Sequence, residues 1–170
     1  MRYLVMSDSH GDSDIVVEIA KMYENKVDAM FHCGDSELEP SDKVWEDFYV
    51  VGGNCDYSSD YEDVQVVTLG SDTIFLTHGH LYGVNFGMER LSLAAKEANA
   101  TIALFGHTHR AGCEVIDRIL YLNPGSISQP RGLIQKKLYA IIDSDETRYD
   151  IQYYSREHVP QKELHFVFKK

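Results

Sequence analysis

The sequence predicts an α/β fold built on mixed β-sheets that include parallel strands. Apolar, strand-like runs alternate with one amphipathic helix over the first 54 residues, and this β–α–β order is typical of parallel strands. Two strand-like runs on either side of residues 70–72 predict a hairpin, which adds antiparallel pairing. From residue 113 onward only strand-like runs occur, so strands rather than helices should complete the sheets.

The N-terminal part should contain three buried strands and one helix. Strands are expected over residues 2–6, 28–33 and 45–51, where short apolar runs end in small or polar residues. Between the first two strands, apolar residues recur at helical spacing, namely Ile15, Ile19, Met22 and Tyr23. In such a sheet ligands bind beyond the carboxyl ends of the strands, so the residues that follow each strand are candidates for a site.

Strands should make up most of the remaining chain. Residues 64–69 and 73–77 flank Gly70-Ser71-Asp72 as a β-hairpin. A second helix is predicted by the spacing of Met88, Leu91, Ala95 and Ala98. Further strands are expected over residues 101–105, 113–116, 119–122, 138–142, 148–154 and 163–168. Strand packing is the expected role of three tyrosines, with substrate stacking as the less favoured alternative: Tyr149, Tyr153 and Tyr154.

Length and composition are those of an ordinary globular protein. The 170 residues suffice for one domain with a sizeable core, so a single domain over residues 1–170 is expected. Hydrophobic residues make up 44% and charged residues 25%, both typical of soluble proteins. The net charge of −11 argues against stable nucleic-acid binding, which needs clustered Lys and Arg.

The sequence predicts a cytoplasmic protein without a membrane segment. No apolar stretch is long enough to span a bilayer, and the first residues lack the pattern of a signal peptide. Cys33, Cys55 and Cys113 are odd in number and follow no paired spacing. A reducing compartment is the simplest setting for such cysteines.

Five strand-like runs end in side chains that can bind a metal ion. These segments are Asp8-Ser9-His10, Gly34-Asp35, Gly53-Asn54, His78-Gly79-His80 and Gly106-His107-Thr108-His109. Three of them hold five of the eight histidines. Any one segment could be an ordinary turn, but five such turns together would be a coincidence. The donors are too many for one catalytic zinc, and they suit two cations that share a carboxylate.

The ordered motifs DSH, GD, GN, HGH and GHTH closely resemble those of the calcineurin-like metallophosphoesterase superfamily. The resemblance extends from Asp8 to the segment Asn123-Pro124-Gly125-Ser126 and is nearest to the small single-domain phosphodiesterases of prokaryotes. It implies a four-layer α-β-β-α sandwich of two mixed sheets with a dinuclear metal site at the strand ends. By matching positions, one metal would be held by Asp8, His10 and His109, the other by Asn54, His78 and His107, and Asp35 would bridge them.

The resemblance also implies the reaction. A metal-bound hydroxide would attack a phosphodiester of a small or flexible phosphoester substrate, because divalent cations lower the pKa of bound water. Imidazole and carboxylate ligands without a thiolate suit manganese, iron, zinc or nickel, and manganese is the first expectation. Two alternatives stay open: a phosphomonoesterase, and a non-catalytic protein-binding scaffold like the retromer subunit of this fold. Self-association into a homo-oligomer is also left open.

The chain departs from the family's pattern at the proton donor to the leaving group. Family members with a GNHE motif carry a histidine after the asparagine, whereas this chain has Cys55 there, in GNCD. His80 could replace this histidine as the proton donor, or it could instead orient His78. The expected catalytic residues are therefore Asp35, Asn54 and His80. His32, Asp56 and Asn123 are expected to be structural. Arg110 is expected to be solvated, with contact to a phosphate oxygen as the less favoured alternative.

Overall fold

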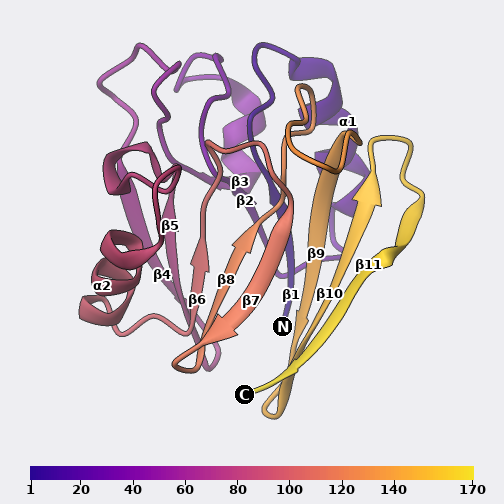
Figure 1. The fold of residues 1–170 in the computed structure, drawn as a ribbon. Helices are drawn as coiled ribbons and strands as arrows, with labels where there is room; N and C mark the ends of the chain where they lie inside the picture. Colours follow the sequence, from indigo (N-terminus) through magenta and orange to yellow (C-terminus); the bar gives the residue numbers. More distant parts are fainter.

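Two mixed β-sheets packed face to face form the centre of the structure, and each carries a helix on its outer face (Figure 1). The structure, a computed structural model, describes all residues from 1 to 170. One core of 19 buried residues lies between the sheets, and two smaller cores join each sheet to its helix. These three cores make four layers, which confirms the α-β-β-α sandwich that the sequence implied. None of the helices is long and apolar enough to cross a bilayer.

The six-stranded sheet has the order β11-β10-β9-β1-β2-β3. Its strands are β1 (Arg2–Met6), β2 (Ala29–His32), β3 (Phe48–Val50), β9 (Leu138–Ser144), β10 (Arg148–Ser155) and β11 (Pro160–Lys169). Strands β1, β2 and β3 pair in parallel, and the other pairings are antiparallel. Helix α1 (Ser13–Tyr23) covers the outer face, where Ile15, Val16 and Ile19 are buried against the sheet.

The five-stranded sheet has the order β4-β5-β6-β8-β7. Its strands are β4 (Val64–Leu69), β5 (Asp72–Thr77), β6 (Ile102–Leu104), β7 (Gly112–Ile116) and β8 (Ile119–Asn123). The three central strands β5, β6 and β8 pair in parallel, whereas β4 and β7 run antiparallel at the edges. Helix α2 (Glu89–Glu97) buries Leu91 and Ala95 on the outer face of this sheet.

Every predicted strand and helix is present, and the differences are at element boundaries. Residues 45–47 do not extend β3 but belong to the 3₁₀ helix η1 (Lys43–Asp47), because Trp45 turns inward and its ring packs 5.2 Å from His32. A second 3₁₀ helix, η2 (His80–Tyr82), follows β5. Strand β11 begins at Pro160, three residues earlier than expected. The tyrosines pack in β10 as predicted: Tyr149 and Tyr153 are buried, and Tyr154 stacks on Tyr139.

The parallel strands of both sheets present their carboxyl ends at one edge of the sandwich, the upper edge in Figure 1. The segments that follow β1, β2, β3, β5 and β6 therefore meet there, and they are the five segments that carry the candidate metal ligands. The fold brings these segments together from positions that are up to about a hundred residues apart in the chain.

The two sheets are joined at the opposite edge by a buried carboxylate. Asp72 on β5 is 1% exposed and accepts hydrogen bonds from Tyr3 (3.0 Å) and Ser144 (2.5 Å), both of the other sheet. The ammonium group of Lys170 lies 2.7 Å from the same carboxylate. Because all of these groups are partnered, the cluster connects the sheets without leaving a buried charge unpaired.

Replacing Asp72 should destabilise the sandwich far more than replacing an exposed aspartate. Asp72→Ala leaves the hydroxyls of Tyr3 and Ser144 without their partner, so we expect a loss of about 3 kcal/mol in the free energy of unfolding. Urea unfolding at pH 7 measures it. The control is Asp143→Ala, which removes an exposed ion pair with Arg2 and should cost below about 1 kcal/mol. Equal losses in the two variants would contradict a joining role for Asp72.

Candidate metal centre

Two groups of acidic and imidazole side chains converge at the upper edge of the sandwich. Asp8, His10, Asp35 and His109 form the first group, and Asp35, His78 and His107 form the second. Within each group the potential ligand atoms all lie within 4.8 Å of one another. Asp35 is the one residue common to both groups, and its role as a bridging carboxylate stays a prediction.

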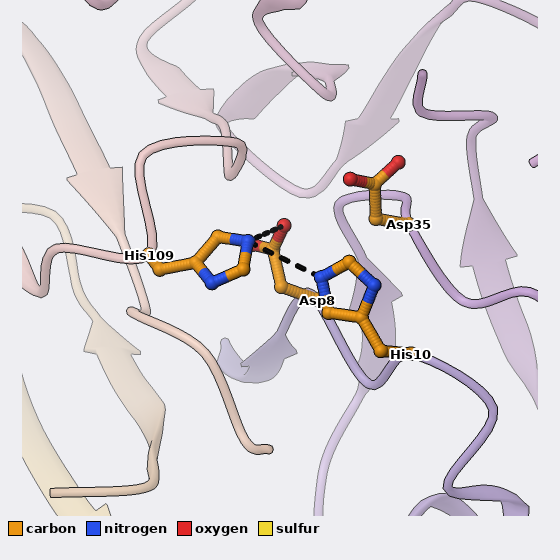
Figure 2. Close-up of side chains that lie close together, drawn as sticks. All are labelled: Asp8, His10, Asp35 and His109. Carbon is orange, nitrogen blue, oxygen red and sulfur yellow. Dashed lines mark hydrogen bonds and ion pairs between the residues drawn. The ribbon is translucent and has the colours of Figure 1, made fainter. Parts of the chain in front are cut away.

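The first group has the spacing that one cation would require. His109 Nε2 lies 3.1 Å from Asp8 Oδ1 and 3.2 Å from His10 Nε2, and Figure 2 shows the two rings facing each other beside the carboxylate. Metal–nitrogen bonds are about 2.0–2.1 Å long, so two nitrogens bound at a right angle would be about 3 Å apart. Both oxygens of Asp8 are buried and form no hydrogen bond. Buried polar atoms without partners are costly, and a cation would satisfy them.

The second group is also arranged around a common point. His78 is fully buried, and its Nε2 lies 3.2 Å from Asp35 Oδ2 without forming a hydrogen bond. The ring of His107 lies 5.2 Å from that of His78. Since Asp35 Oδ1 accepts a hydrogen bond from the Cys55 N–H at 2.7 Å, its second oxygen is the one that faces His78. The residues present therefore fit two cations with one shared carboxylate.

The candidate histidines are oriented through their second ring nitrogen. In three of them Nδ1 is bonded at 2.6–2.7 Å to an oxygen acceptor: His10 to Glu37 Oε1, His78 to the Cys33 carbonyl and His109 to the Gln129 carbonyl. A carbonyl oxygen can only accept, so Nδ1 of His78 and of His109 carries a proton, and Nε2 is the nitrogen through which each ring would bind a metal ion. This arrangement is typical of histidines that bind metal ions.

The backbone of the ligand segments is held in a left-handed conformation that only glycine adopts without cost. Positive φ angles between 46° and 65° occur at six residues of the site, which are Asp8, His10, Asp35, Glu37, His107 and His109. Each costs about 1–3 kcal/mol and persists only where the surroundings enforce it. Clusters of such residues are characteristic of functional sites, because the strained turns aim side chains at one point.

Asp56 ties the segment after β2 to the segment after β3. Its carboxylate accepts hydrogen bonds from the backbone N–H groups of Gly53 (2.8 Å) and Glu37 (2.7 Å) and from the hydroxyl of Ser36 (3.0 Å). Gly53 is required at this junction, because a side chain there would overlap the carboxylate of Asp35. These contacts agree with the structural role that was expected for Asp56, because they hold two ligand segments together.

Buried polar side chains tie the remaining segments together. The amide of Asn123 donates to the Gly106 carbonyl at 2.8 Å, and the hydroxyl of Ser126 donates to the Asp8 carbonyl at 2.7 Å. His32 lies between two other segments, with Nε2 3.1 Å from the Ser9 hydroxyl and Nδ1 accepting from the Gly34 N–H. Burial lowers the pKa of His32 to about 4, so the ring is neutral and acts as a structural link.

The pKa values of Asp35 and of the neighbouring Cys55 shift in opposite directions. Burial favours the neutral acid, yet the adjacent His78 and the Cys55 N–H outweigh it and lower the pKa of Asp35 below its ordinary value. The carboxylate is thus ionised at neutral pH. The neighbouring thiol behaves oppositely, since burial and the nearby carboxylates raise the pKa of Cys55 to about 11. Asp35 therefore provides a permanent negative charge, and the thiol next to it stays neutral.

Asn54 and His80 lie beside the two groups of ligands, but their contacts do not assign them a role. Asn54 lies in the segment after β3, where its amide nitrogen is 3.3 Å from Cys55 Sγ, and its role as a ligand stays a prediction. The ring of His80 lies 5.3 Å from His78 and 6.2 Å from His107, and its buried Nδ1 has no partner. Because the Cys33 carbonyl binds Nδ1 of His78, His80 contributes packing rather than a hydrogen bond to the orientation of that ring.

Two residues of the site were missed by the sequence analysis. Glu37 binds His10 at 2.6 Å, and Asn85 lies 2.7 Å from His107 through its side-chain amide. Glu37 stands two residues after Asp35, and this spacing is the only feature of the sequence that points to a place for Glu37 in the site. Asn85 belongs to the segment between η2 and α2, which contains no candidate ligand, so only the folded chain shows its contact.

Comparison with known proteins gives close relatives. A probable metallophosphoesterase of Bacillus subtilis, YsnB, is 41% identical over 156 residues, which cover 92% of each chain. A crystal structure from Streptococcus pneumoniae TIGR4, described as a predicted phosphoesterase, superimposes with a TM-score of 0.98 at 45% identity and covers 99% of this chain and 97% of its own. The phosphodiesterase YfcE of Escherichia coli is 35% identical over 103 residues, 56% of this chain and 52% of YfcE.

The fold is shared more widely than the sequence. Vps29 of Entamoeba histolytica, in a crystal structure with Zn²⁺, superimposes with a TM-score of 0.73 at 17% identity and covers 100% of this chain and 98% of its own, a likeness of fold alone. The model of the calcineurin-like phosphoesterase superfamily domain matches residues 1–147. With this match and the identity to YsnB, the chain belongs to the calcineurin-like phosphoesterase superfamily.

Proposed function

We propose that this protein is a metal-dependent hydrolase that cleaves phosphodiester bonds in a small or flexible substrate. The observation that carries the proposal is the buried carboxylate of Asp35, which belongs to both groups of potential ligands. A shared carboxylate suits two divalent cations about 3.5–4 Å apart, the spacing at which they contact both the attacking and the leaving oxygen.

The proposed ligands divide into two sets around Asp35. Asp8, His10 and His109 would hold one cation, and Asn54, His78 and His107 the other. When bound, two divalent ions would supply an activated water and neutralise the charge that develops on the phosphoryl oxygens. Two buried carboxylates leave such a pair of ions with a net positive charge, which would attract a phosphate to an otherwise acidic chain. We expect manganese as the native metal and the cytoplasm as the location.

The chain itself would orient the substrate and control protons. The ligand segments are cross-tied by Asp56, Asn123 and Ser126, so the ligands are held in place before substrate arrives. Cys55 lies beside the first group but its thiol is a weak acid. His80 lies beside the second group, and its unpartnered Nδ1 could hold or deliver a proton.

A diesterase is favoured over the two alternatives. A monoester carries two negative charges and calls for extra cationic groups, and the chain offers few candidates beyond Arg110 and Arg131. The name of YfcE, a phosphodiesterase, supports the same choice. A purely protein-binding role would leave the carboxylates of Asp8 and Asp35 buried without a cation, at a cost of several kcal/mol.

Metal reconstitution is the direct test of this function. Protein stripped with a chelator should hydrolyse neither diesters nor monoesters, and adding divalent cations should restore the hydrolysis of diesters first. We expect the highest kcat/KM with Mn²⁺ among Mn²⁺, Fe²⁺, Zn²⁺ and Ni²⁺, measured against bis(p-nitrophenyl) phosphate and p-nitrophenyl phosphate. Full activity of the stripped protein, or a preference for the monoester with every metal, would overturn the proposal.

Removing the shared carboxylate should empty the site. Asp35→Asn keeps the shape but removes the charge that both cations would share, so we expect most bound metal to be lost. The fall in kcat/KM should exceed the roughly 10–100-fold typical of residues that only orient a ligand. Metal analysis and diester kinetics measure the two effects. The matched control is Asp14→Asn on the exposed face of α1, which should change neither. Two metals per chain in Asp35→Asn would refute the bridging role.

Leaving groups should report on the proton donor. Because position 55 holds a thiol instead of an imidazole, we expect aryl diesters to be cleaved much faster than alkyl diesters. General acid catalysis is typically worth about 10²–10⁴-fold, so Cys55→His should accelerate the alkyl diesters by up to that factor and barely change the aryl ones.

A leaving-group series measured on both proteins tests this expectation. The parallel variant His80→Ala separates the two candidate donors, since it should slow alkyl diesters selectively only if His80 delivers the proton. A flat dependence in the unmodified protein, with chemistry rate-limiting, would show that another acid already serves, and the role given to position 55 would be wrong.

A further inference from the structure

An open cavity lies beside the segment that carries His107 and His109. It has a volume of about 510 Å³, which is in the range of small-ligand sites, roughly 300–1,000 Å³. Six residues line it, two of them cationic and three apolar: Arg110, Ala111, Arg131, Gly132, Leu133 and Ile134. None of the seven proposed metal ligands is among them, so the cavity is adjacent to the metal centre and distinct from it.

The two arginines that line the cavity have no partner in the protein. Neither guanidinium group forms an ion pair, although the acidic residues outnumber the basic ones by 27 to 16. Arg110 and Arg131 are both exposed. Guanidinium groups bind phosphate through parallel N–H···O bonds, and two of them at one cavity supply the positive charge that a phosphate dianion requires.

The cavity is anchored to one of the proposed metal ligands. Arg110 follows His109 in the chain, and the backbone N–H of Arg131 donates to the His109 carbonyl at 3.1 Å. The Gln129 carbonyl, two residues before Arg131, accepts the proton of His109 Nδ1 at 2.6 Å. The two segments that carry Arg110 and Arg131 are thus both held against His109. A substrate with its reacting phosphate at the metals would reach the cavity with a neighbouring group.

The rest of the cavity wall is apolar. Leu133 is fully exposed at 105%, and Ile134 and Ala111 are half-buried beside it. An exposed leucine next to two unpaired arginines suits a ligand with an uncharged body and an anionic end. A sugar or a ring between two phosphates has this character.

We infer that this cavity, which we call the Arg110–Arg131 subsite, binds a second phosphate group of the substrate. The natural substrate would then be a phosphodiester whose retained portion carries another phosphate, separated from the reacting one by a sugar-sized body. The inference rests on the proposed diesterase function and adds a substrate class to it.

A matched pair of synthetic diesters tests the inference. Thymidine 5′-(p-nitrophenyl phosphate) and its 3′-phosphorylated form share the leaving group and the reacting centre, so their kcat/KM values differ only through the second phosphate. With the metal-loaded protein we expect the 3′-phosphorylated form to be preferred by about ten-fold or more, mainly through a lower KM. A second readout is the equilibrium binding of thymidine 3′,5′-bisphosphate compared with thymidine 5′-phosphate, measured by calorimetry.

Substitutions should abolish the preference and not the reaction. Arg131→Gln and Arg110→Gln should each reduce the preference toward one and weaken binding of the bisphosphate by about ten-fold. The control is Arg118→Gln, an exposed and unpaired arginine in the turn between β7 and β8, which should keep the preference unchanged.

The outcomes separate this inference from the proposed function. Hydrolysis of both diesters with equal efficiency would overturn the subsite and leave the diesterase standing, whereas hydrolysis of neither by the metal-loaded protein would overturn the diesterase. If the arginine variants lost activity equally on both diesters and on p-nitrophenyl phosphate, the arginines would be serving the reacting phosphate, and the inference would be wrong.

Discussion

The carboxylate of Asp35 is held between the two groups of potential ligands, and the rest of the site is arranged around it. One of its oxygens accepts the Cys55 N–H at 2.7 Å, and the other lies 3.2 Å from His78 Nε2. A charge buried in this way is stable only if the groups around it are fixed, because desolvation costs several kcal/mol unless partners compensate. This requirement accounts for the left-handed turns at six site residues and for Gly53, which leaves the space that the carboxylate fills.

The cost of these turns is offset by hydrogen bonds that run between the ligand segments. Asp56 joins the segments after β2 and β3, His32 joins those after β1 and β2, and Asn123 with Ser126 joins the GHTH and DSH segments through their backbone carbonyls. The segments after β1, β2, β3 and β6 each depend on a side chain from another part of the chain. The site is therefore rigid as a unit, which is what electrostatic stabilisation of a transition state requires.

Stability and chemistry are placed at opposite edges of the same sandwich. At the edge opposite the ligand segments, Asp72, Tyr3, Ser144 and Lys170 form a fully partnered cluster between the sheets. At the upper edge, by contrast, the oxygens of Asp8, Nε2 of His78 and Nδ1 of His80 lack partners. Native proteins rarely leave buried polar atoms unsatisfied, so this imbalance supports the proposal that metal ions bind at the upper edge.

The sequence by itself determined the elements and the donors, because both are local properties. Strand and helix periods located every strand and helix, with bounds correct to within about three residues, and the ligand-type side chains directly follow predicted strands. It missed the 3₁₀ helix at Trp45, where a tertiary contact turns the ring inward, and it could not reveal the contact of Asn85 with His107. Only the tertiary structure decided which strands are neighbours, which ring nitrogen faces the centre and where the two arginines meet. These features depend on contacts such as that of Ser126 with Asp8, which are 118 residues apart. Hydrophobic periodicity reports only on local structure, so it cannot predict a contact between residues so far apart in the chain.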